Sequence, residues 1–195
     1  DELVAALSAL LAGLPVRVTQ GTPRLPIDRV FTMSGFGVVV TGTLLDGALR
    51  VGQDVEIQPA GVRARIRGMQ SHEEEITAAD PGRRLAVNLR GADKLALRRG
   101  DVVGLPGVWL PTALIDAWLR YLPSAHLPLE HDDEVKFFVG AAEVMAHVRV
   151  LDREHVLPGE HSWVQLRLEH PIVAARGDRY ILRRASPPET IGGGV

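Results

Sequence analysis

Short strand-like segments at close spacing are the feature that most restricts how this sequence can fold. From residue 25 onward, segments rich in β-branched residues are separated by glycine, proline and aspartate, as expected between strands. Strands spaced this closely, with few helices between them, predict closed antiparallel β-barrels rather than alternating strands and helices. The first series of predicted strands comprises residues 25–34, 38–44, 54–59, 62–70, 83–91 and 101–105.

A break at residues 105–112, LPGVWLPT, divides the chain, because two prolines and Gly107 interrupt the strand pattern there. We therefore predict an all-β protein of two tandem antiparallel β-barrels, over residues 23–107 and 110–195. Between the last two strands of the first barrel, residues 92–101 could hold one helical turn. The second series of predicted strands comprises residues 112–122, 134–140, 141–152, 161–170 and 179–186.

The first 22 residues follow a different pattern. Leucine and valine recur at helical spacing up to Leu14, and Gly13 with Pro15 is predicted to end the helix. One amphipathic helix cannot bury its own apolar face. We therefore expect residues 1–22 to be the end of an upstream domain followed by a linker.

Several classes of protein are excluded by composition. The chain has no cysteine, so disulfides and thiolate metal sites are ruled out, and its seven histidines show no metal-ligand spacing, so we predict no metal. It contains no apolar run of the roughly 18 residues that a membrane span needs, and nothing at its N-terminus reads as a signal peptide, so we expect a cytoplasmic protein. A net charge of −2 argues against non-specific DNA binding and leaves RNA contact to local patches.

Catalytic motifs are also missing from the sequence. No GxxxxGK[ST] phosphate-binding loop occurs, and no serine–histidine–aspartate order or carboxylate pair stands out. We expect the chain by itself to be catalytically inert.

Three sequence motifs, in order, carry a family resemblance. The stretch LPIDRVFTMSGFGVVVTGTLLDGALRVGQDVEI, with its predicted turn at Gly35-Phe36-Gly37, resembles domain two of the elongation factor Tu superfamily. RRLAVNLRG followed by LRRGDVVG continues the match, and LEHPIVAARGDRYILRRASPPETIGGGV resembles domain three. Within the superfamily, PIDRVFTMSGFGVVVTGT and SPPETIGGGV are most similar to selenocysteine-specific elongation factors.

This resemblance implies a translation-factor function. The initial helix would be left from a missing GTPase domain, and the parent protein would bind GTP and magnesium there, whereas this fragment would bind no cofactor. Its partners would be selenocysteinyl-tRNA, the ribosome and the missing GTPase domain. Four alternatives remain open: a general elongation factor, the gamma subunit of the initiation factor for initiator tRNA, the GTPase-like large subunit of sulfate adenylyltransferase, and a protein-interaction module.

The resemblance also implies an aminoacyl-tRNA pocket. Asp28 would accept a hydrogen bond from the α-amino group of the amino acid, and Arg29 and Arg84 would face its side chain. A selenol is largely ionised near neutral pH, and guanidinium groups favour that anion through charge-assisted hydrogen bonds. Phe31 and Thr41 align with pocket residues of the general factor. The alternative for Asp28 and the arginines is an ion pair that joins strands at the barrel rim, and Phe31 is equally compatible with the barrel core.

Two groups of arginines are further candidates, for contact with RNA phosphates. Arg63, Arg65 and Arg67 alternate with apolar residues, which places three cations on one face of a strand. Arg183 and Arg184 lie near the end of the second barrel and are candidates for the tRNA backbone. A solvated strand face would explain both groups as well.

Overall fold

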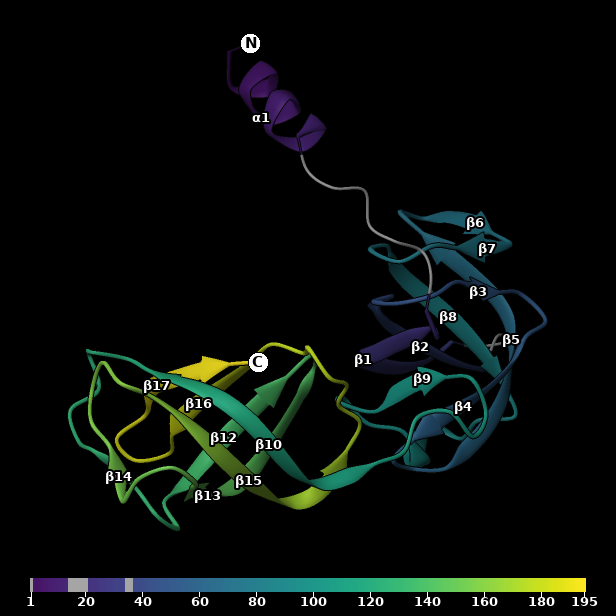
Figure 1. Cartoon of the computed structure of the whole chain (residues 1–195). Coiled ribbons are helices and arrows are strands. Elements are labelled where there is room, and N and C mark those ends of the chain that lie inside the picture. The colour runs from purple at the N-terminus through teal and green to yellow at the C-terminus, as the bar shows by residue number, and fades with distance from the viewer. Residues whose placement is uncertain (1, 14–20, 34–36) are drawn as a thin grey trace.

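The computed structural model describes residues 2–13, 21–33 and 37–195. It consists of one helix and two closed, six-stranded antiparallel β-barrels that lie side by side (Figure 1). The predicted fold class is therefore confirmed. Gly35 and Phe36 of the predicted turn, and Pro15 at the predicted helix end, lie outside the described residues.

Barrel one closes because its six main strands form a ring in the order β4-β9-β1-β2-β8-β5, with β5 pairing back onto β4. Every pairing in this ring is antiparallel. A two-stranded β3–β7 sheet and the short strand β6, paired with β5, extend one end. The strands are β1 (Arg24–Met33), β2 (Gly37–Thr43), β3 (Leu49–Arg50), β4 (Asp54–Gln58), β5 (Val62–Ser71), β6 (Glu74–Ile76), β7 (Ala78–Ala79), β8 (Arg84–Arg90) and β9 (Val102–Gly104).

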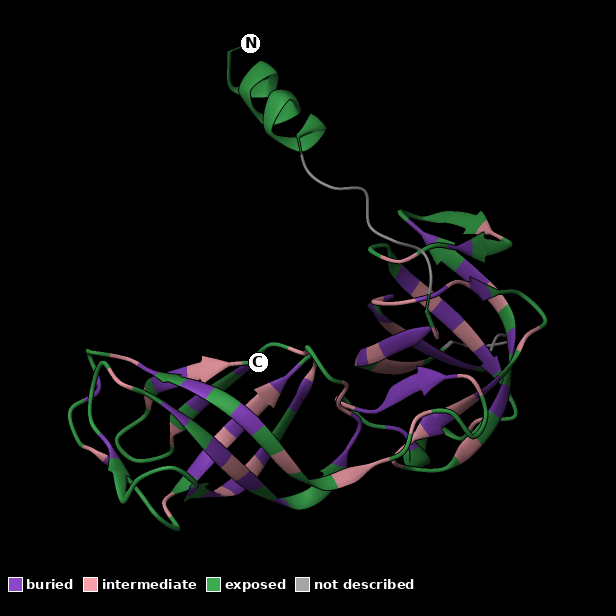
Figure 2. Ribbon diagram, viewed as in Figure 1, coloured by how far each residue is buried: buried purple, intermediate pink, exposed green. Residues whose placement is uncertain are grey.

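The interior of barrel one is aliphatic. Buried and exposed residues alternate along the strands of the barrel (Figure 2). In β5, Ala64 and Ile66 are buried between exposed arginines. Gly42 faces this interior, where a Cβ atom would lie 2.2 Å from the Pro26 carbonyl oxygen. Glycine at position 42 therefore relieves crowding between the strands. One helical turn was predicted in residues 92–101, and it forms as the 3-10 helix η1 (Lys94–Ala96).

Barrel two closes in the order β10-β15-β13-β12-β16-β17, with β17 pairing back onto β10. Its core is separate from that of barrel one and contains three aromatic side chains, Tyr121, Phe137 and Tyr180. The strands are β10 (Thr112–Tyr121), β11 (Leu129–Glu130), β12 (Glu134–Val139), β13 (Ala142–Val150), β14 (His155–Val156), β15 (His161–Ile172), β16 (Tyr180–Arg184) and β17 (Glu189–Gly194).

The N-terminal helix α1 (Glu2–Ala12) packs on neither barrel. None of its residues is buried, and its leucines are exposed to solvent (Figure 2). An apolar helix face of this kind is normally covered by another element. Among the described residues, no helix is long and apolar enough to cross a membrane.

Candidate functional site

A β-bulge in β1 places a carboxylate on the outer surface of barrel one. Ile27 pairs with Gly42 and Arg29 pairs with Thr41, so Asp28 is an extra residue with no partner across the strands. This insertion lets Ile27 and Val30 both face the interior while Asp28 and Arg29 face outward. The bulge thus interrupts the ordinary alternation of the strand and places two consecutive charged residues on its outer face.

Asp28 is held by two neighbouring strands. Its Oδ1 atom accepts hydrogen bonds from Thr41 Oγ1 of β2, at 2.6 Å, and from Arg84 Nη2 of β8, at 3.1 Å. The second Arg84 nitrogen, Nη1, donates to Oδ2, which makes the ion pair bidentate. Three of the five predicted pocket residues are therefore in direct contact.

The electrostatics of this cluster follow from the same contacts. The hydrogen bonds from Arg84 and Thr41, with the nearby charge of Arg29, outweigh partial burial and hold the pKa of Asp28 below its ordinary value. The Asp28 carboxylate in turn raises the pKa of Arg84. Both groups stay accessible, with side-chain exposures of 28% for Asp28 and 54% for Arg84. The cluster therefore presents a fixed anion and a fixed cation to anything that binds there.

A basic hollow of about 490 Å³ adjoins the cluster. Arg29 and Phe31 of β1 line one side, and the segment around η1 supplies Lys94, Arg98 and Arg99. With Asp28 as the only carboxylate in its lining, the hollow has four cations and one anion. Lys94, Arg98 and Arg99 were not predicted from the sequence, although three basic residues within six positions were a signal that could have identified them.

Phe31 also lines a second hollow, of about 570 Å³. There it lies in a cross-strand row with Val39, Asn88 and Gly68, from β2, β8 and β5. The Asn88 Oδ1 atom is buried and has no hydrogen-bond partner among the described residues. Half-buried Phe31 is thus shared by the linings of a basic hollow and of a mainly apolar one that contains an unused acceptor.

The arginines proposed for RNA phosphates differ in how far their partners restrain them. Arg63, Arg65 and Arg67 are exposed on one side of β5, as predicted. Arg65 is bound to Asp54 by two hydrogen bonds, of 2.7 and 3.0 Å. Arg63 lies 4.0 Å from Glu56, and Arg67 lines the second hollow.

Arg183 and Arg184 of β16 point in different directions. Arg183 is exposed, whereas the Arg184 side chain is 15% exposed and donates to Tyr121 Oη at 3.2 Å and to the Pro128 carbonyl at 3.1 Å. These bonds give Arg184 a structural role within barrel two. Among the described residues, no group of three histidine, aspartate or glutamate side chains could hold a metal ion.

Comparison with protein families gives a match for each barrel. The family model described as "Elongation factor Tu domain 2" matches residues 37–104. The model described as "Selenocysteine-specific elongation factor, beta-barrel domain" matches residues 117–195.

Two known proteins are similar over most of the chain. A protein of Desulfomicrobium baculatum named "Selenocysteine-specific elongation factor" is 44% identical over 171 residues, which cover 88% of this chain and 27% of that protein. A crystal structure titled as a bacterial selenocysteine-specific elongation factor, EF-Sec, has a TM-score of 0.82 at 24% identity, covering 100% of this chain and 31% of the other. That second likeness shows a shared fold. The chain spans about a quarter of the length of the curated relative.

Proposed function

This chain belongs to the selenocysteine-specific elongation factors, whose elongation factor Tu domain 2 and SelB-type β-barrel domain it carries, and we propose that it binds selenocysteinyl-tRNA. In the parent protein, a GTPase domain with bound GTP and magnesium would close onto barrel one and hold the aminoacyl end between them. GTP hydrolysis on the ribosome would then open the clamp and release the tRNA, because loss of the γ-phosphate removes the contacts that keep such domains closed.

The observation that carries this proposal is the Asp28–Arg84–Thr41 cluster on the bulge of β1. An aminoacyl ester has a free α-amino group, which is a donor, and selenocysteine adds an anionic side chain. A carboxylate can accept about four hydrogen bonds and a guanidinium can donate five, so Asp28 and Arg84 keep capacity for a ligand while bound to each other. In this arrangement Asp28 takes the amino group, and Arg84 and Arg29 take the selenolate.

The two hollows beside Phe31 extend the proposal to the rest of the tRNA end. The terminal adenosine fits the mainly apolar hollow, where its base would contact Phe31 and its amino group would donate to the unused Oδ1 of Asn88. The phosphates that follow fit the basic hollow of Lys94, Arg98 and Arg99. Phe31 lines both hollows, so one strand of nucleic acid would reach them together.

The test is the selectivity of the parent protein for selenocysteinyl-tRNA over its seryl precursor. Replacing Arg84 with alanine removes a cation that the selenolate needs and the neutral serine hydroxyl needs much less. We expect R84A to weaken selenocysteinyl-tRNA binding by roughly 1.5–3 kcal/mol and to change seryl-tRNA binding little. Titrating both charged tRNAs at one fixed salt concentration measures the difference.

Arg183→Ala is the matched control, because it removes an exposed guanidinium from barrel two. If Arg183 contacts a phosphate, its replacement would weaken the binding of both tRNAs alike and flatten the salt dependence of that binding. Lowering the pH enough to protonate the selenol should shrink the selectivity of the unsubstituted protein. Equal losses for the two tRNAs in R84A would contradict selenolate recognition and leave Arg84 as a structural or backbone contact.

A further inference from the structure

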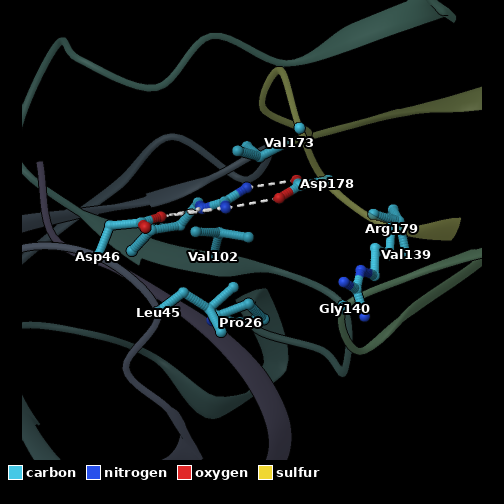
Figure 3. A pocket seen from close by; sticks show the side chains of 12 residues that line it. Pro26, Leu45, Asp46, Val102, Val139, Gly140, Val173, Asp178 and Arg179 are labelled. Carbon is cyan, nitrogen blue, oxygen red and sulfur yellow. Dashed lines mark hydrogen bonds and ion pairs between the residues drawn. The ribbon is translucent and has the colours of Figure 1, made fainter. Parts of the chain in front are cut away.

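Arg24, the first residue of β1, is a buried cation at the junction of the two barrels. It is 6% exposed, and in the described part of the chain no other lysine or arginine is buried. Its Nη2 atom donates to Asp178 Oδ1 of barrel two at 2.7 Å, and Nη1 donates to the second carboxylate oxygen. Towards its own barrel, Nε and Nη2 donate to Asp46 Oδ2 at 3.2 and 3.1 Å. Figure 3 shows Asp46 and Asp178 at the two ends of this set of interactions.

The partners of Arg24 are themselves fixed in place. Asp178 Oδ2 accepts the backbone N–H of Ala175 at 2.8 Å, which closes the loop between β15 and β16. The ring of Trp109, in the segment that joins the barrels, lies 5.2 Å from the guanidinium. Trp109 Nε1 also donates to the Pro23 carbonyl at 3.0 Å. Barrel one, barrel two and their connecting segment therefore meet at one side chain.

A second contact joins the barrels at the tip of the β12–β13 hairpin. There a Cβ atom on Gly100 would lie 3.0 Å from Ala142 Cα, and Arg99 Nε donates to the Ala141 carbonyl at 3.3 Å. A cavity of about 590 Å³ separates this contact from the Arg24 cluster, and both barrels contribute to its walls (Figure 3). These two contacts between the barrels have open space between them, and the Arg24–Asp178 ion pair is the strong polar bond at one of them.

We propose that Arg24 is a positioning residue for tRNA binding, because its ion pair with Asp178 sets the angle at which the barrels present their surfaces to one tRNA. This inference rests on the proposed function. Buried ion pairs contribute little net stability, since desolvation offsets most of the attraction, but they fix geometry when both partners are held. A planar guanidinium bound by two carboxylates is directional, so rotation of one barrel against the other would break the bonds.

Arg24 lies outside both hydrophobic cores. Loss of its bond to Asp178 should therefore leave each barrel folded and let the angle between the two barrels vary. A ligand that contacts both barrels then binds more weakly, because the second contact is no longer held in reach of the first.

The test compares Asp178→Asn with Asp46→Asn. Each variant removes one carboxylate charge from Arg24, but Asp46 belongs to the same barrel as Arg24 and Asp178 to the other. Asparagine can still accept the Ala175 N–H, so the loop of barrel two is retained. Because the chain contains no cysteine, spin labels can be attached at two introduced cysteines, D80C on barrel one and E154C on barrel two, both at exposed positions.

Double electron–electron resonance on the labelled chain should show a broadened distance distribution in D178N and an unchanged one in D46N. In the parent protein, D178N should weaken selenocysteinyl-tRNA binding at least about tenfold and leave the preference over seryl-tRNA unchanged. D46N should leave the affinity for selenocysteinyl-tRNA and the preference over seryl-tRNA near those of the unsubstituted protein.

An unchanged distance distribution in D178N would overturn the proposal, whatever the tRNA affinity. A broadened distribution with unaltered affinity would overturn the positioning role. Failure of the unsubstituted parent to bind charged tRNA would instead overturn the proposed function. This outcome is distinguishable from the other two because it occurs without any substitution.

Discussion

The two barrels share one architecture and differ in where their aromatic and charged residues lie. Barrel one is filled with aliphatic side chains and carries its charged cluster outside, on a bulge of β1. Barrel two has Tyr121, Phe137 and Tyr180 in its core, and outside it exposes Trp118 and Trp163, whose rings contact each other edge to face. Closure of six strands therefore specifies the interior pattern and leaves the outer faces free to differ. The candidate site belongs to one outer face and not to the fold.

The largest expected effect tests whether the two cores are independent. Phe137→Ala should destabilise barrel two by about 3–5 kcal/mol, because a buried aromatic leaves a large cavity. Trp118 and Trp163 lie in barrel two, whereas Trp109 contacts Pro23 and Arg24 of barrel one. In a Trp109→Phe background, tryptophan fluorescence during urea unfolding therefore reports on barrel two. The midpoint of that transition should fall in the variant.

Leu85→Ala is the matched control in barrel one, where Leu85 is 1% exposed. It should lower the urea midpoint of an unfolding transition followed by circular dichroism and leave the fluorescence midpoint unchanged. If both variants moved the fluorescence midpoint equally, the barrels would unfold as one unit and the comparison would fail.

Alkaline pH should affect barrel two more than barrel one, because both tyrosines of the chain lie in the core of barrel two. Burial raises the pKa of Tyr180 and of Tyr121, the latter against the opposing influence of Arg184. Above the unfolded pKa of about 10, the unfolded chain loses a proton that the folded barrel keeps, so stability falls as the pH rises. At pH 11 the loss from Tyr180 alone is about 1.4 kcal/mol, and Tyr121 adds to it in the same direction.

Urea unfolding followed by fluorescence at pH 8 and pH 11 measures this loss. Tyr180→Phe should remove about 1.4 kcal/mol of the difference, since the tyrosine with the large pKa shift is gone. A pH dependence that survives unchanged in Y180F would assign it to other groups.

The smallest expected effect lies at the acid end and in barrel one. The depressed pKa of Asp28 means that its ionised form is favoured in the folded state, so its contribution is present above the unfolded pKa of about 3.9 and is lost as the pH falls through the folded pKa. Asp28→Asn should cost less than about 1 kcal/mol at pH 7, because Arg84 is half exposed. The difference in the free energy of unfolding between D28N and the unsubstituted chain should vanish at a pH below the folded pKa of Asp28, as measured by circular dichroism. A cost that persists there would have a cause other than ionisation.

Local sequence patterns were enough to predict the barrels. Alternating residues such as Val62 to Ile66, and the break around Gly107, are properties of neighbours in the chain, and the strands follow them closely. The grouping of Asp28, Thr41 and Arg84 at one site was reached through a family resemblance, which places residues of different strands together. The ion pair between Asp28 and Arg84 is the alternative that the sequence left open. Their roles towards tRNA stay predictions.

Features that depend on the register or on distant contacts were not predicted. The bulge at Asp28 leaves no periodic signal, because it is one unpaired residue in a strand. The basic hollow joins the segment around Lys94 to β1, and the Arg24–Asp178 pair joins residues 154 positions apart. A composition or spacing argument contains no information about such pairs.

The bulge has a consequence for how this site could arise or be lost in evolution. Since Asp28 is the unpaired residue, deletion of its codon would leave Ile27 and Val30 facing the core in a regular strand. A single in-frame deletion of Asp28 would thus erase the carboxylate and preserve the barrel, whereas a deletion in β1 outside residues 28 and 29 would turn buried side chains outward. The fold and the site are separable by one codon, so a barrel that had no such site could gain its carboxylate by one in-frame insertion.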